Sequence, residues 1–358
     1  MKKERRLIPR WGWAALSVIL VVAGSGCDAM KSVTDQNAAP APVPTAPVVE
    51  SSAPVQPAPV APVPVVKTPQ QIIAEFLGLP SAEKRDDGLK QLAELKEGLD
   101  AVTDLDLTRS GVSDDGMKAL VAFPKLEKLN LSDTRVSNAG LASVAEVKSL
   151  RTIILANQRG IDDNGILALA PLKDMESLTI NGCSVTDVVL PTLAEFEGLQ
   201  VLNLSGNTEI YGKDFKTLTS KGAFRNLREL HVRGSKFGYY GLEQMNKMPK
   251  LEVLLAGSCE LAGPAINGLA GCEHLRVLDL SQNRLQDDNM KGVSRLKNLE
   301  ELRLNDLPLT DECLNSIKTM KNLKVLNLNG TRVTEPKIQL LKEKFLKDTE
   351  ILAIGQKF

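Results

Sequence analysis

The stretch LDLSQNRLQDDNMKGVSRLKNLEELRL at residues 278–304 contains the pattern on which the fold of this chain depends. It begins and ends with the same triplet: an apolar residue, any residue, and a second apolar residue. A short polar stretch follows the first triplet, and the segment LQDDNMKGV comes next. The two triplets start 24 residues apart, which is a length typical of one structural repeat.

The same triplet recurs along most of the chain. Successive triplets begin 24, 24, 25, 24, 28, 24, 24, 24, 24 and 26 residues apart, a spacing that chance does not keep over eleven copies. The triplets are LDL 105–107, LNL 129–131, IIL 153–155, LTI 178–180, LNL 202–204, LHV 230–232, LLA 254–256, LDL 278–280, LRL 302–304, LNL 326–328 and LAI 352–354.

This period has a simple physical meaning. Side chains alternate along a strand, so the flanking apolar residues of each triplet point inward and the middle residue points outward. Each repeat leaves an apolar face that only the next repeat covers, so the chain is expected to fold as a stack of coils. Each buried aliphatic side chain contributes about 1.5–3 kcal/mol. The sequence therefore predicts an α/β solenoid with a parallel sheet of about eleven short strands on its concave side.

Small polar residues follow most triplets near the fifth position after each start, where the chain leaves the sheet. Such side chains can bond backbone groups in a turn, and Ser, Thr or Asp in the segments that come next can cap a convex helix. These segments closely resemble the cysteine-containing class of leucine-rich repeats, which includes bacterial and F-box-associated members. The resemblance covers about residues 99–358 and implies the leucine-rich repeat horseshoe. The polar turn residues are Ser110, Thr134, Cys183, Asn207, Ser235, Cys259, Asn283 and Thr331.

Two repeats depart from the pattern. Leu307 and Pro308 replace the polar turn residue in one of them, and the repeat that starts at residue 202 has four extra residues. We expect the aromatic residues of this longer region to fill a wider coil; the alternative is that they form part of a contact surface. They are Tyr211, Phe215, Phe224, Phe237, Tyr239 and Tyr240.

Residues 1–26 have the order of a secretory signal. Residues 1–10 carry five basic side chains and one acidic side chain, and residues 11–23 are apolar but shorter than the roughly 20 residues that span a bilayer. The residues that end at Cys27 resemble a lipobox, although Gly24 stands where a Leu is usual. The resemblance implies lipidation of Cys27 and a membrane-anchored envelope lipoprotein that faces the periplasm or the exterior. The alternatives are an ordinary signal and an uncleaved anchor.

Residues 27–69 form the predicted linker. Ten of the nineteen prolines lie in residues 38–69, interleaved with Ala and Val. Such a run favours a disordered spacer with extended polyproline II segments. The alternative is that a partner domain recognises the run.

Two helices are expected after the linker. Thr68 followed by Pro69 is typical of a helix start, and Ser81 is typical of a second one. We expect residues 70–98 to form a helical cap and residues 99–358 to form the leucine-rich repeat domain. The apolar stripe of the second helix is Leu89, Leu92, Leu95 and Leu99.

Composition and motifs do not indicate catalysis, a cofactor or a metal. Basic and acidic residues balance at 44 each, so nucleic acid is not expected as a partner, and two histidines supply few groups for acid–base chemistry. The chain has no CxxC or GxSxG motif, and residues 205–214 lack the spacing of a phosphate loop. The Asp-rich turns at residues 162–164 and 287–289 could bind calcium, but each is also typical of a helix N-terminus. The four cysteines after Cys27 are expected to be packed, reduced thiols.

The outward positions of the sheet are the candidate binding surface. Val253, Leu255 and Val277 are expected to form an exposed apolar centre with charged residues on both sides, as in protein interfaces. We therefore predict a non-enzymatic module, tethered to the bacterial envelope, that binds a protein or peptide through its concave face. The alternative is a structural scaffold or spacer without a specific ligand. The predicted contact residues are Glu229, His231, Arg233, Val253, Leu255, Val277, Asp279, Glu301, Arg303 and Asn305.

The lipobox resemblance predicts the mass of the mature protein. Intact-mass measurement is expected to show loss of residues 1–26 and a diacyl or triacyl adduct on Cys27. Cys27→Ala, which removes the thiol that would be acylated, is expected to yield a soluble or uncleaved chain. A wild-type protein that keeps its first 26 residues and carries no lipid would contradict the prediction.

Overall fold

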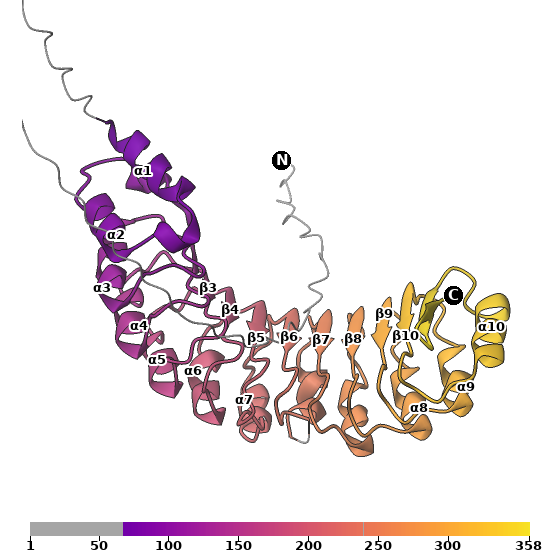
Figure 1. The fold of residues 1–358 in the computed structure, drawn as a ribbon. Helices are drawn as coiled ribbons and strands as arrows, with labels where there is room; N and C mark the ends of the chain where they lie inside the picture. The colour runs from indigo at the N-terminus through magenta and orange to yellow at the C-terminus, as the bar shows by residue number, and fades with distance from the viewer. Residues whose placement is uncertain (1–66, 239) are drawn as a thin grey trace, which may run out of the picture. The chain divides into compact units, whose positions relative to one another are not determined.

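The computed structural model describes residues 67–358 except residue 239. The predicted signal peptide, Cys27 and nearly all of the predicted linker lie outside the described residues. The described chain belongs to one compact unit, in which a single sheet of twelve strands follows chain order (Figure 1). The strands line the concave side, and helices and turns form the convex side. Within this part of the chain, no helix has both the length and the apolar character needed to cross a membrane.

Strands β1–β11 are parallel and in register, and β12 pairs antiparallel with β11. Leu105 lies beside Leu129, for example, and both leucines are fully buried. The strands are β1 Asp104–Asp106, β2 Lys128–Asn130, β3 Thr152–Ile154, β4 Ser177–Thr179, β5 Val201–Asn203, β6 Glu229–His231, β7 Val253–Leu255, β8 Val277–Asp279, β9 Glu301–Arg303, β10 Val325–Asn327, β11 Glu350–Ala353 and β12 Gln356–Lys357.

The first ten predicted triplets are confirmed, but the eleventh was wrong by one residue. Ile351, rather than Leu352, pairs with Leu326 and points inward together with Ala353. Ile354 was expected inside and is 42% exposed in the turn between β11 and β12. The physical reason is that the chain folds back as a hairpin at this position, and a shift of one residue turns every side chain to the opposite face.

Short helices and 3-10 turns cover the convex side of the sheet (Figure 1). Before the first strand come α1 Pro69–Gly78, η1 Ser81–Glu83, α2 Asp86–Ala93 and η2 Leu99–Ala101. The elements between later strands are α3 Asp114–Met117, η3 Lys118–Ala122, α4 Asn138–Val144, α5 Asp163–Ala168, η4 Asp187–Val189, α6 Leu190–Ala194, α7 Phe215–Ser220, η5 Leu242–Lys247, η6 Gly263–Leu269, η7 Asp287–Asn289, α8 Met290–Val293, η8 Asp311–Cys313, α9 Leu314–Ile317 and α10 Glu335–Lys344.

One of the two predicted helix starts is confirmed. The Thr68 hydroxyl accepts a hydrogen bond from the Gln71 amide, and Pro69 is the first residue of α1. The start at Ser81 was wrong, because η1 makes only a single turn and α2 begins at Asp86. At the start of α2, the Asp86 carboxylate accepts hydrogen bonds from the backbone amide and the hydroxyl of Ser113, which joins this helix to the first repeat.

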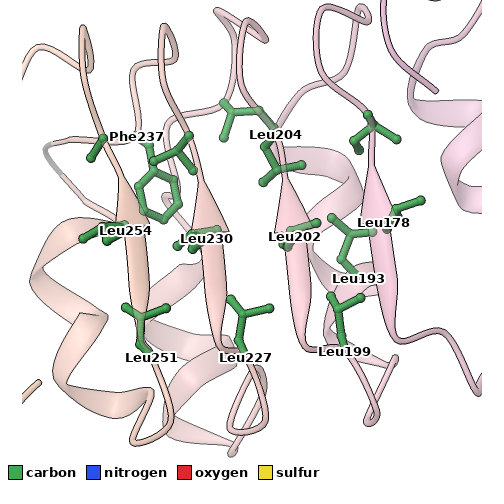
Figure 2. Packing of buried hydrophobic residues seen from close by; sticks show 14 of the residues in the cluster. Leu178, Leu193, Leu199, Leu202, Leu204, Leu227, Leu230, Phe237, Leu251 and Leu254 are labelled. Atoms are coloured by element: carbon green, nitrogen blue, oxygen red, sulfur yellow. The ribbon is translucent and has the colours of Figure 1, made fainter. Parts of the chain in front are cut away.

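Stacked leucines form the core between the sheet and the convex elements. Leu178, Leu202, Leu230 and Leu254 occupy equivalent positions on β4 to β7 and are fully buried (Figure 2). Each of these side chains packs against its counterpart in the next coil, as the repeat pattern predicts. The core therefore extends along the whole stack as one continuous cluster of buried residues.

The predicted polar turn residues bond the backbone, and several of them join neighbouring coils. The Asn283 amide donates to the carbonyls of Leu280 in its own coil and Ala256 in the preceding coil. The Ser110 hydroxyl is the exception: it is buried without a hydrogen-bond partner among the described residues. Gln158 takes this role in the third coil, where the sequence pattern did not identify it, and donates to the Leu131 carbonyl.

Acidic residues at several convex helix starts tie their coil to the next one. Asp163 accepts hydrogen bonds from the backbone and hydroxyl of Thr186, both at 2.7 Å. Asp287 accepts the same two bonds from Thr310, at 2.9 and 2.7 Å. The two Asp-rich turns are therefore helix N-termini, and one carboxylate of each turn is hydrogen bonded to the following coil.

Three of the six predicted aromatic residues fill the wider coil, so this prediction is confirmed in part. Phe215 stacks on Phe224 at 5.0 Å and meets Phe237 edge-on at 4.9 Å, and all three are buried. Tyr211 and Tyr240 do not join this cluster: the hydroxyl of Tyr211 bonds Glu209, and Tyr240 is exposed. Tyr239, the sixth predicted aromatic residue, lies outside the described residues.

The four cysteines of the repeats are buried and free. Cys183 and Cys259 donate to backbone carbonyls from the polar turn position, at 3.1 and 2.9 Å. Burial raises the pKa of Cys183, Cys259 and Cys272 to about 11 and that of Cys313 to about 12. The thiols therefore stay protonated at neutral pH and act as small packed side chains.

The hydrogen bonds between Asp287 and the following coil predict that Asp287 contributes more than Asp288 to the free energy of unfolding. Asp287→Ala removes both hydrogen bonds from Thr310, and the free energy of unfolding is expected to fall by about 1–3 kcal/mol. Asp288→Ala is the matched control, because this carboxylate is exposed and bonds only Lys291 three residues on. Its expected cost is at most about 0.5 kcal/mol. Equal losses in denaturant titrations would contradict the assignment.

Candidate functional site

The register of β6 to β9 brings the ten predicted contact residues together on the concave face. Glu229, Val253, Val277 and Glu301 lie side by side in the row where these strands begin. His231, Leu255, Asp279 and Arg303 form the second row, at the strand ends. Arg233 and Asn305 follow in the turns, at the level of Gly257 and Ser281.

The apolar centre is present, but it is less exposed than the sequence suggested. Val253, Leu255 and Val277 are each partly buried. Their side chains lie on adjacent strands, so they shield one another from water. His231 contributes to this packing beside Leu255, with only 14% of its side chain exposed.

Asp279 lies in the outward row, as predicted, but the expectation that it is an exposed contact residue was wrong. Only 1% of the residue is exposed. One carboxylate oxygen accepts the Ser281 amide at 2.9 Å and the Ser281 hydroxyl at 2.5 Å. The other oxygen lies 3.3 Å from the guanidinium of Arg233. The burial of this charge is possible because the carboxylate is hydrogen bonded and paired with a cation.

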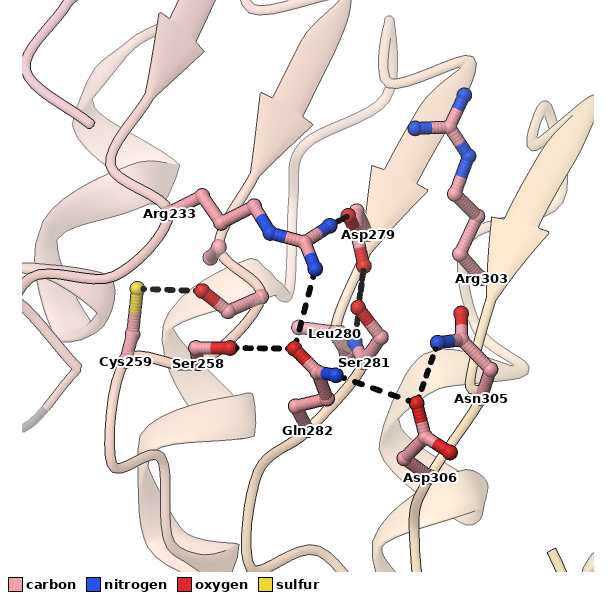
Figure 3. Close-up of polar contacts among 12 residues, drawn as sticks. Arg233, Ser258, Cys259, Asp279, Leu280, Ser281, Gln282, Arg303, Asn305 and Asp306 are labelled. Atoms are coloured by element: carbon pink, nitrogen blue, oxygen red, sulfur yellow. Dashed lines mark hydrogen bonds and ion pairs between the residues drawn. The ribbon is translucent and has the colours of Figure 1, made fainter. Parts of the chain in front are cut away.

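The ion pair between Arg233 and Asp279 spans two coils, and Gly257 makes it possible. Arg233 follows β6, whereas Asp279 ends β8, so the side chain crosses the coil of β7 (Figure 3). A Cβ atom on Gly257 would lie 2.8 Å from the Ser281 hydroxyl and 3.2 Å from the nearer Asp279 carboxylate oxygen. Any larger residue at this position would therefore occupy the space of the network.

The network continues across the turns toward β9. Arg233 also donates to the Gln282 side-chain oxygen at 3.0 Å, and Ser258 donates to the same oxygen at 2.7 Å (Figure 3). The Gln282 amide in turn donates to Asp306 at 3.3 Å, and the Asn305 amide donates to the same carboxylate oxygen at 3.0 Å. Arg233 is thus held in one place, with about half of its side chain exposed.

Two further contacts border the apolar centre. Arg303 forms an ion pair with Glu301 on its own strand, with nitrogen–oxygen distances of 2.7 and 2.6 Å. The Nε2 atom of His231 is buried, lies 3.5 Å from the Glu229 carboxylate and makes no hydrogen bond with a described residue. His231 is therefore a packed residue of the concave face.

The edge at which the chain enters the strands carries a separate series of charges. Glu300 accepts hydrogen bonds from Arg276 at 2.9 and 3.0 Å and from Lys324 at 2.7 Å, which lowers its pKa to about 2. This trio borders a polar hollow of about 320 Å³, and a second hollow of about 550 Å³ lies near Arg151 and Glu176. Neither hollow is lined by any of the predicted contact residues.

Sequence reasoning missed three residues that organise this face: Gly257, Gln282 and Asp306. Gly257 has no side chain, and in the sequence nothing indicates that the side chain of Arg233 crosses this position. Gln282 and Asp306 lie in the turns and adopt positive φ angles of 56° and 58°. Among the described residues, no group of three or more His, Cys, Asp or Glu side chains could hold a metal ion.

Comparison with known proteins agrees with this geometry. Residues 102–121, 124–145 and 271–292 match the leucine rich repeat family model. No curated protein sequence matches the chain. The coils, the register and these matches define the fold class: the described chain folds as a leucine-rich repeat solenoid.

Solved structures share the fold at low sequence identity. An internalin from Listeria monocytogenes is 19% identical with a TM-score of 0.55, covering 75% of this chain and 76% of that chain. A leucine-rich repeat protein of Leptospira interrogans is 19% identical with a TM-score of 0.52, covering 74% and 68%. A chain from an octameric complex of latrophilin 3, Unc5D and FLRT2 is 16% identical with a TM-score of 0.51, covering 72% and 85%.

The ion pair between Arg233 and Asp279 predicts that the effects of substituting these two residues on the free energy of unfolding are coupled. In a double-mutant cycle of Arg233→Met and Asp279→Asn, the coupling energy in the free energy of unfolding is expected to be about 1–3 kcal/mol, because Asp279 is buried. The control cycle uses Glu301→Gln and Arg303→Met, a pair whose carboxylate is more exposed than that of Asp279, and it is expected to give at most about 1 kcal/mol. Additive losses for Arg233 and Asp279 would contradict the role assigned to the pair.

Proposed function

We propose that this chain is a non-enzymatic recognition module that binds a protein or peptide segment through the concave face of β6 to β9. The observation that carries this proposal is the partly buried aliphatic centre of Val253, Leu255 and Val277, bordered by fixed charged groups. Protein interfaces combine an apolar middle with a polar rim in this way.

The order of the polar network also supports binding. Arg233 is held by Asp279 and Gln282 before any partner arrives, so its side chain loses little further freedom on binding. One solved structure of the same fold, in a complex with latrophilin 3 and Unc5D, contributes leucine-rich repeats to an assembly of proteins. The face of β6 to β9 is open and spans several strands, which suits an extended segment.

We further propose that the module is tethered to the bacterial cell envelope through lipid on Cys27. The basic, apolar and small segments before Cys27 and the proline-rich stretch after it support this part of the proposal. In this arrangement the linker holds the repeat domain away from the membrane that carries the lipid.

The proposal is tested by capturing partners from envelope extract with the purified protein. Wild type is expected to retain one partner in stoichiometric amount, and Leu255→Gln is expected to retain about tenfold less, because it places a polar group in the apolar centre. Gln is chosen rather than Glu, since a carboxylate at this position would lie beside Asp279.

Leu167→Gln is the matched control for this experiment. Leu167 lies on the convex helix α5 and is 36% exposed, so its substitution is expected to leave capture unchanged. Thermal unfolding of both variants checks that the fold is intact. Equal capture by wild type and Leu255→Gln would contradict the proposal, and association with cell-wall material alone would favour a structural scaffold.

A further inference from the structure

The charges around the apolar centre are unequal in number. Strands β6 to β9 and the four residues after each strand carry four carboxylates but only two guanidinium groups. Both guanidinium groups are already paired: Arg233 with Asp279, and Arg303 with Glu301. Glu229 and Asp306 remain, and neither forms an ion pair with a described lysine or arginine.

These two carboxylates lie on opposite sides of the apolar centre. Glu229 begins β6, and 38% of its side chain is exposed. Asp306 follows β9 and is exposed, and the side chains of Gln282 and Asn305 hold its carboxylate by hydrogen bonds. The aliphatic row of Val253 and Val277 lies on the two strands between them.

Building on the proposed function, we infer that the partner is an extended peptide segment with an aliphatic residue between two basic residues. The aliphatic side chain would cover Val253, Leu255 and Val277, and lysine or arginine side chains would reach Glu229 and Asp306. Partner charges are arranged in this complementary way in specific interfaces, where they select among segments.

Strand spacing sets the separation of the basic residues. Three intervals of about 4.8 Å lie between β6 and β9, and Asp306 lies beyond the far end of its strand, so the carboxylates are on the order of 15–20 Å apart. An extended chain covers this distance in about four to six residues. The inferred segment therefore has its two basic residues four to six positions apart.

The inference is tested by selecting a display library of random twelve-residue peptides on the purified full chain. Enriched peptides are expected to carry two basic residues four to six positions apart, with Leu, Ile, Val or Met between them. A synthetic copy of one enriched peptide is then titrated against the variants. Glu229→Gln and Asp306→Asn are each expected to weaken binding about two- to fivefold, with a smaller effect at high salt.

Asp306→Asn preserves the site apart from its charge. Asn tolerates the left-handed backbone conformation found at this position, and its side-chain oxygen can still accept from Gln282 and Asn305. Asp288→Asn on the convex side is the matched control and is expected to leave affinity unchanged.

The outcomes separate this inference from the proposed function. Enriched peptides that are neutral or acidic, but lose binding to Leu255→Gln, overturn the inferred partner chemistry and leave the proposed function standing. A selection without any peptide that depends on Leu255 overturns the proposed function, and the inference with it. Basic peptides whose affinity is unchanged in Glu229→Gln and Asp306→Asn also overturn the inference.

Discussion

The structure depends on one constraint: the apolar face of each coil is covered only by its neighbours. Leu202, for example, is fully buried because Leu178 and Leu230 stand beside it on the adjacent strands. The inward positions must therefore repeat at the same level in every coil. Polar ties such as that between Asp163 and Thr186 keep the convex side in the same register. Together these contacts hold the strands parallel and in chain order.

The same constraint does not act on the outward positions, so these can hold residues of any type. The candidate site consists of such outward residues. With glycine at position 257, Arg233 reaches across a whole coil to the buried carboxylate of Asp279. The pair and Gln282 then form a fixed polar border beside the aliphatic side chain of Leu255. A face with local order can thus arise without any change in the repeat that supports it.

Much of the fold could be predicted from the sequence because the inward pattern is local and repeated. The prediction failed where the repetition ends, at Ile351 to Ile354, because a hairpin replaces the next coil. It also failed for Asp279, since burial of this residue depends on Arg233, which lies 46 positions earlier. The alternation of side chains along a strand predicts only that Asp279 faces outward. It cannot predict an ion pair with Arg233, because that residue lies two coils earlier.

Methyl NMR spectroscopy of the full chain with a bound partner segment tests the proposed concave binding face most directly. Binding is expected to shift the methyl resonances of Val253, Leu255 and Val277, which form the centre of the concave face. The convex methyl groups of Leu167 and Val188 are expected to keep their positions. Shifts confined to those convex groups, with the concave methyl resonances unchanged, would contradict the account.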